Sequence, residues 1–217
     1  ISKRSMSGRS RPPGRRSASS WCDMPKPAES LAGDLVTAVE TLSEVFDERG
    51  IEYALLGGLA TMLRGRPRFT QDVDILLSVP QVALPGLLGE LIHRGFSLDT
   101  DTVIREFVQH HMTAFRFGVV RIDWLKPVLP LYAHALAAAT SIPWTAGHSL
   151  RVLAAEGLII TKMVAFRPQD QEDIRMLIAA NAPLLDVELI RREWATVADG
   201  EEQRSAWLEA ALAVIGE

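Results

Sequence analysis

Apolar positions along this chain follow two spacings, and the change from one to the other divides it into helices and strands. Residues 30–49 carry an apolar side chain at every third or fourth position, which predicts an amphipathic helix that Gly50 ends. Residues 52–56 form a short apolar run of the kind found in buried strands. A short helix over residues 59–63 and a second strand over 68–77 follow, so helix and strand alternate from the start.

The same alternation continues through the rest of the chain. We expect helices over residues 84–93, 130–140 and 155–166, a further helix from Pro168, strands over 111–117, 119–125 and 150–153, and two more helices between 186 and 215. Residues 96–110 are ambiguous, and we expect a short strand and a loop there. The pattern predicts an α/β (α+β) protein, with a mixed-sheet core over residues 28–145 and a helical portion over 146–217 packed on it.

Charge separates the first residues from this body. The net charge of −4 conceals six basic and no acidic residues among the first 20, and 17 basic against 27 acidic residues in the rest. Residues 1–27 have no hydrophobic period, which predicts disorder. They are either an arm that attracts nucleic acid or sequence upstream of a start at Met6 or Met24, and we favour the second. The sequence shows no apolar run of the kind found in a signal peptide or a membrane-spanning helix. The lone Cys22 cannot form an internal disulfide, which agrees with a reducing compartment. We therefore expect a cytoplasmic protein without a membrane partner.

Polar side chains alternate with apolar ones along the 68–77 strand. Arg68, Thr70, Asp72 and Asp74 occupy every second position, so all four project to one face. Two carboxylates so placed repel each other unless a cation lies between them or one takes up a proton. Mg²⁺ prefers carboxylate oxygens and keeps waters and phosphates in its other positions. The sequence therefore predicts a divalent-cation site on this face.

A glycine pair, Gly57-Gly58, lies between the first strand and the short helix. Glycine lets the backbone approach a ligand closely, and the N-terminus of a helix directs unpaired N–H groups at an anion. Neither a Gly-x-Gly-x-x-Gly fingerprint nor a P-loop pattern is present. The pair thus predicts a phosphate cradle, 13 residues of chain ahead of Asp72.

This combination resembles the signature of the DNA polymerase β-like nucleotidyltransferase superfamily. The Arg-x-Thr-x-Asp-x-Asp strand is similar to that of the small bacterial AbiEii-like and related toxin-type nucleotidyltransferases. Gly58 stands where many relatives have serine, so one hydroxyl donor to the phosphates is missing. The resemblance implies a palm-like domain that transfers a nucleoside monophosphate from an NTP such as ATP to an acceptor hydroxyl, with Mg²⁺ or Mn²⁺ as cofactor and release of pyrophosphate.

Asp123 is a carboxylate in the middle of the otherwise apolar 119–125 strand, and burying an unpaired charge is costly. In the superfamily a neighbouring strand supplies a third metal-binding carboxylate, so the resemblance implies this role for Asp123. The alternative is an ion pair with Arg121 or Lys126 at the edge of the sheet.

A later motif, Lys162-x4-Arg167-x2-Asp170-x2-Asp173, also resembles the toxin-type enzymes. The resemblance implies that Lys162 faces the nucleotide phosphates and that Asp173 is needed for activity. The alternative is structural: Asp170 caps the helix that begins at Pro168, and Asp173 pairs with Arg167 or Lys162.

The resemblance thus implies two overlapping sets of site residues. The catalytic set is Asp72, Asp74, Asp123, Lys162 and Asp173, in which the metal ligands are Asp72, Asp74 and Asp123. The nucleotide-binding set is Gly57, Gly58, Arg68, Thr70 and Lys162. The resemblance does not settle the acceptor. We favour RNA, foremost a tRNA 3′ end, which would make the protein the toxin of a toxin–antitoxin pair with a cognate antitoxin as partner. The alternatives are a protein or aminoglycoside-like acceptor, or a non-catalytic nucleotide-sensing or partner-binding protein.

Overall fold

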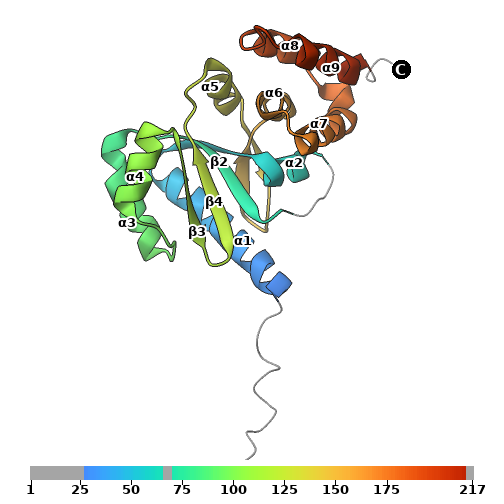
Figure 1. Ribbon diagram of the computed structural model, residues 1–217. Helices are drawn as coiled ribbons and strands as arrows, with labels where there is room; N and C mark the ends of the chain where they lie inside the picture. The colour runs from blue at the N-terminus through green and yellow to red at the C-terminus, as the bar shows by residue number, and fades with distance from the viewer. Residues whose placement is uncertain (1–26, 66–69, 214–217) are drawn as a thin grey trace, which may run out of the picture.

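Six strands pair into one mixed sheet in the order β3-β4-β2-β1-β6-β5 (Figure 1). The computed structural model describes residues 27–65 and 70–213. Its strands are β1 (Glu52–Leu56), β2 (Asp72–Ser78), β3 (Met112–Phe117), β4 (Val120–Leu125), β5 (Thr140–Pro143) and β6 (Ser149–Val152). β2 and β4 are parallel, as are β1 and β6, whereas the other neighbours are antiparallel. The predicted α/β class with a mixed sheet is confirmed.

Three helices, α1 (Pro27–Glu48), α3 (Leu84–His93) and α4 (Thr100–Gln109), lie on the first face of the sheet. Figure 1 shows α1 running behind β3 and β4. An aromatic cluster joins this layer to the sheet: the ring centroid of Trp124 lies 5.9 Å from Phe46 of α1, 6.1 Å from Phe107 of α4 and 4.8 Å from Phe115 of β3. Aromatic rings bury a large apolar area each, so this cluster anchors the first layer.

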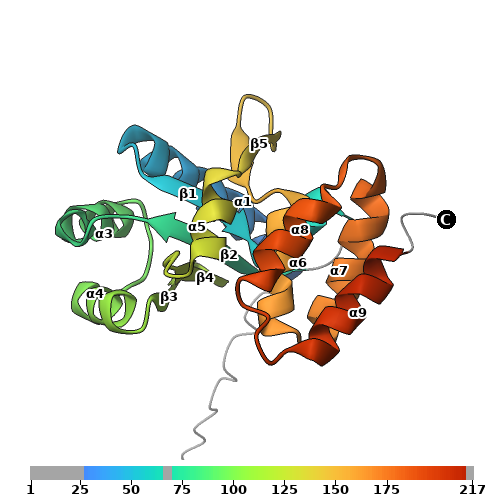
Figure 2. The same cartoon turned by 90° about the horizontal axis from the view of Figure 1, so that it is seen from above.

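The remaining helices lie toward the second face. α2 (Gly57–Arg64) joins β1 to the β2 side of the sheet, and α5 (Pro130–Ala137) contacts β1. α6 (Ala155–Ala165) packs against α2 and α5, and α7 (Pro168–Asn181), α8 (Val187–Ala195) and α9 (Glu202–Leu212) pack around it. In Figure 2 these last three helices gather on the opposite side of the molecule from α3 and α4. Helices α6 to α9 thus form a helical C-terminal part, whereas β6, which lies within residues 146–217, is paired with β1 in the sheet. The division between residues 145 and 146 stays a prediction.

The main error in the sequence prediction concerns residues 96–110. Apart from an isolated bridge between Ser97 and Arg116, the strand and loop expected there are replaced by helix α4. The Asp99 carboxylate caps this helix by accepting a hydrogen bond from the Thr102 N–H at 2.9 Å. Val103 and Phe107, four residues apart, bury its inner face. The helix expected over 130–140 also ends early, because Thr140 begins β5.

Candidate active site

The site is built on the second face of the sheet, where neighbouring strands place their polar residues side by side. In the parallel pair of β2 and β4, Asp72 is the register partner of Arg121, and Asp74 is the partner of Asp123. Partners on adjacent strands project to the same side, and so do residues two apart along one strand. Three carboxylates and one guanidinium thus share a small area of this face.

Helix α2 begins where β1 ends, and its first residue lies against Asp74. Gly57 has a φ of +65°, a left-handed conformation that favours glycine. A Cβ on Gly57 would overlap the Asp74 carboxylate and would lie 2.9 Å from the Asp74 Cβ. The Gly58 N–H donates a hydrogen bond to Asp74. The N-terminus of α2 therefore directs one of its N–H groups at the Asp74 carboxylate.

The Asp74 carboxyl is held in an environment that disfavours its charge. Burial, together with the negative charges of Asp123 and Asp72, raises the pKa of Asp74 to about 6. The hydrogen bond from Gly58 and the charge of Lys162 act in the opposite direction and only partly offset these effects. This corner of the sheet therefore carries more negative charge than the surrounding protein balances, which suits a cation.

Asp123 makes the contact that the sequence left open as an alternative to metal binding. The Arg121 Nε donates to Asp123 Oδ2 at 2.8 Å, and Arg121 Nη2 donates to Oδ1 at 2.7 Å. Among residues 27–65 and 70–213, no three His, Cys, Asp or Glu side chains are arranged to hold a metal ion. Asp72 and Asp74 by themselves fit Mg²⁺, since that ion is commonly bound by one or two carboxylates plus waters and phosphates.

Lys162 lies in a buried cluster of charges on α6 and α7. Its Nζ donates to Asp173 Oδ2 at 2.6 Å and lies 3.5 Å from Asp170 Oδ1. Asp170 also accepts from the Arg167 backbone N–H at 3.1 Å and from the Arg167 Nε at 2.7 Å, so it caps α7. Lys162, Asp170 and Asp173 are each less than 10% exposed. The contacts foreseen under the structural alternative are therefore all present.

One cavity of about 480 Å³ joins the two clusters. It is lined by Gly57, Gly58, Thr70, Asp72, Asp74, Lys162 and Asp173 from the predicted set, and also by Leu56, Gln71, Leu125, Thr161, Ala165, Arg167, Gln169 and Asp170. Asp123 stands beside Asp74 but outside this lining, and Arg68 falls outside the described residues. Sequence reasoning did not foresee Thr161 and Ala165. The available signal was helical spacing, because Ala165 lies three residues after Lys162 and Thr161 lies four residues before Ala165.

The far end of α2 is fixed by side chains from distant parts of the chain. Arg64 donates to the carbonyl oxygen of Leu153 at 3.0 Å and to that of Val152 at 3.2 Å, at the end of β6. Asn181, the last residue of α7, donates to the Arg64 carbonyl oxygen at 2.8 Å. These bonds hold the glycine pair at the N-terminus of α2 in a fixed position relative to α7.

Comparison with known proteins locates this fold. No protein-family model matches the chain, and no curated protein matches it by sequence. An antigenic nucleotidyltransferase-like protein from Paracoccidioides brasiliensis aligns with a TM-score of 0.50 and 21% identity, over 82% of this chain and 94% of that one. The antibiotic-resistance factor ANT(2'')-Ia aligns with a TM-score of 0.50 and 19% identity, over 82% of this chain and 96% of that one.

These likenesses show that the chain has a nucleotidyltransferase fold, which is the fold class that the sequence predicted. The narrower likeness to AbiEii-like proteins stays a prediction. Within the described residues no helix is both long and apolar enough to cross a membrane.

Proposed function

We propose that this protein transfers a nucleoside monophosphate from an NTP to an acceptor hydroxyl. The observation that carries this proposal is the shared cavity, in which Asp72, Asp74, Lys162 and the N-terminus of α2 face the same space. Carboxylates for a metal ion, a cation and backbone donors are what phosphoryl transfer requires, because positioning and charge neutralisation supply most of the catalysis.

Asp72 and Asp74 are the residues that would hold Mg²⁺. When bound, the ion would supply Lewis-acid stabilisation of the charge on the phosphate oxygens. Burial raises the pKa of Asp74 first and the charges of Asp123 and Asp72 raise it further, and the nearness of these two carboxylates supports a cation at this position. Asp123, the register partner of Asp74, would join the metal ligands if its ion pair with Arg121 broke.

The other residues bind and orient the triphosphate. Lys162 and the backbone N–H groups at Gly57-Gly58 would contact its oxygens. Thr70, two residues before β2 begins, lines the same cavity. The acceptor oxygen forms a bond to the α-phosphorus while the bond from that phosphorus to the bridging oxygen breaks. Pyrophosphate leaves with the electron pair, and the acceptor proton passes to water.

We favour RNA as the acceptor, foremost a tRNA 3′ end, with a toxin role and a cognate antitoxin as corollaries. A small-molecule acceptor is the second candidate, because ANT(2'')-Ia, which shares the fold, is an antibiotic-resistance factor. A carboxylate-rich cavity that contains Asp72, Asp74, Asp170 and Asp173 would also attract a cationic molecule such as an aminoglycoside.

The test is incubation of the protein with each α-labelled NTP and Mg²⁺, in parallel with total RNA and with an aminoglycoside. The Asp72→Asn/Asp74→Asn variant is the control, because it keeps the side-chain shapes and removes both charges. Label in a tRNA-sized band from the native protein alone would support RNA as acceptor, and label on the aminoglycoside would support the second candidate. NTP binding without transfer to any acceptor would contradict the proposal and favour a nucleotide-sensing protein.

A further inference from the structure

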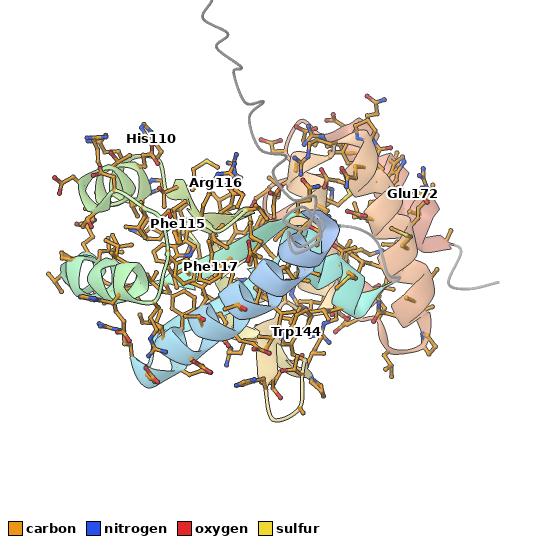
Figure 3. All side chains as sticks on the ribbon, turned by 90° about the horizontal axis from the view of Figure 1, so that it is seen from below. His110, Phe115, Arg116, Phe117, Trp144 and Glu172 are labelled. Atoms are coloured by element: carbon orange, nitrogen blue, oxygen red, sulfur yellow. The ribbon has the colours of Figure 1, made fainter. Side chains whose placement is uncertain are left out.

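The second face of the sheet is exposed along β3, beside the carboxylates. On β3, Met112, Ala114 and Arg116 are all exposed, whereas Thr113 and Phe115 between them are buried against the first layer. In Figure 1 no helix lies across β3 and β4 on this side. Figure 3 labels Arg116 apart from Phe115 and Phe117, as the alternation of side chains along a strand requires. We call this surface, made of Met112, Ala114, Arg116, Arg121 and Asp123, the open platform.

Register places the platform directly next to the candidate metal ligands. Arg116 of β3 is the partner of Arg121 of β4, which is in turn the partner of Asp72. One row of the sheet therefore reads Arg116, Arg121, Asp72. The next row reads Ala114, Asp123, Asp74, and the small side chain of Ala114 leaves the surface low beside Asp123.

The two arginines form an unusual pair. The Arg116 backbone N–H and C=O both bond to Ser97, on the side away from β4. Arg116 and Arg121 are therefore a non-hydrogen-bonded pair, the type with the closest side chains, and like charges directly opposite each other are unfavourable.

Among the described residues, one of these two arginines forms an ion pair with a carboxylate and the other does not. Arg121 is paired with Asp123, whereas Arg116 donates to the Val119 carbonyl oxygen at 3.2 Å. Within the described part of the chain no carboxylate forms an ion pair with Arg116. Its positive charge at this edge is thus available to an anion.

We infer that the open platform binds the phosphodiester backbone of a single-stranded RNA acceptor, with Arg116 as a phosphate contact. This inference rests on the proposed function, and it assigns the surface on which the favoured acceptor lies. The exposed stretch from Met112 to Arg116 is roughly 13 Å long at ~3.3 Å per residue, which is the rise of about four stacked nucleotides. Ala114 and Met112 offer a flat apolar floor for bases, while a cationic acceptor would be repelled by Arg116.

The experiment measures RNA binding without any NTP, so that it does not depend on catalysis. A labelled single-stranded RNA with a free 3′ hydroxyl is titrated with the whole protein at several salt concentrations. Arg116→Glu should weaken binding at least tenfold at low salt, and Arg116→Gln should reduce the slope of log K against log salt by about 0.7, as for one lost phosphate contact. Arg105→Glu, on α4 at the first face, is the matched control and should bind as the native protein does.

A gain of binding provides a second test that does not depend on losing a side chain. Met112→Lys adds a charge to the platform and should tighten RNA binding, whereas Val82→Lys adds the same charge at a 92% exposed position that precedes α3 and should not. Equal effects of the two lysines, or native binding by Arg116→Glu, would overturn the inference.

The two proposals fail separately. If the native protein transfers label to a small molecule and does not bind RNA, the platform inference is wrong and the transferase stands. If Arg116→Glu abolishes RNA binding but no NTP gives transfer to any acceptor, the platform stands and the proposed reaction falls.

Discussion

The Asp74 carboxylate fills the space in which a side chain of Gly57 would lie, so the first residue of α2 can have no side chain. Replacement by alanine would add both a clash with the carboxylate and an unfavourable positive φ. We expect Gly57→Ala to lower the free energy of unfolding by roughly 2–4 kcal/mol, of which about 1 kcal/mol is backbone strain. Urea denaturation measures this loss.

The matched control is Gly89→Ala. Gly89 lies in helix α3 with no heavy atom within 4 Å of the added Cβ, so alanine should be neutral or stabilising by about 0.5–1 kcal/mol. If the two variants were equally stable, the Asp74 side chain could move aside at little cost in free energy. The close approach of Asp74 to Gly57 would then not matter for stability.

Asp74 should make the metal-free protein more stable in mild acid than at neutral pH. Its pKa is about 6 in the folded protein and near 3.8 in the unfolded chain, so the folded state binds more protons between these values. Stability from this group is therefore fully present below pH 3.8 and is lost as pH rises through 6. Asp74→Asn should remove this dependence and gain up to about 3 kcal/mol at pH 7.5 relative to pH 4, at 1.36 kcal/mol per pH unit.

Thermal denaturation across this pH range, with and without Mg²⁺, checks the prediction. Mg²⁺ should raise the Tm of the native protein at pH 7.5 and not that of Asp74→Asn, because a ligand stabilises only the state that binds it. A Tm difference between native protein and variant that does not change with pH would contradict the assigned direction.

Lys162 should have a structural and a functional role that mutations can separate. Lys162→Met leaves the Asp173 carboxylate without its 2.6 Å partner in a buried place, and loss of one member of a buried pair costs about 3–5 kcal/mol. The double variant Lys162→Met/Asp173→Asn removes both charges and should recover much of that loss. If Lys162 also binds phosphate, the recovered double variant should still bind NTP at least tenfold more weakly. Native NTP affinity in the double variant would leave Lys162 a purely structural residue.

Asp123→Asn decides between the two roles that the sequence left open for this carboxylate. If Asp123 is a metal ligand, its replacement should lower the rate of transfer at least a hundredfold. Stability should change by less than about 1 kcal/mol, because the Arg121 side chain is 52% exposed and exposed ion pairs contribute little. Arg121→Gln is the comparison, since it breaks the same ion pair and keeps the carboxylate. If both variants transfer equally well, Asp123 serves only the ion pair.

The sequence predicted the strands that carry the carboxylates because local pattern determines them. Alternation fixed the face of Asp72 and Asp74, and the ends of β1 and of α3 agree with the expected 52–56 and 84–93. The likeness of the glycine pair and Asp-x-Asp strand to a known signature supplied the fold class. Both kinds of signal lie within a few residues of the chain.

What the sequence did not predict depends on long-range pairing or on capping. Helix α4 had two signals in the sequence, a capping residue at Asp99 and apolar residues at helical spacing from Val103 to Val108, and the sequence analysis missed both. β5 is only four residues long, follows an alanine-rich helix and pairs with β6 alone. The contacts of Lys162 and Asp123 were foreseen only as alternatives, because spacing along the chain cannot decide whether a charge faces a neighbour or a cavity.

The parallel pairing of β2 with β4 has a consequence for the making of the protein. Asp72 and Asp74 leave the ribosome after β1 but before β4, since α3, α4 and β3 are synthesised between β2 and β4. Lys162, a cation that lines the same cavity, is synthesised about 90 residues after Asp72. A chain that ends before Asp173 would lack most of α7, which forms one wall of the cavity, and we expect such a fragment to be inactive in the transfer assay.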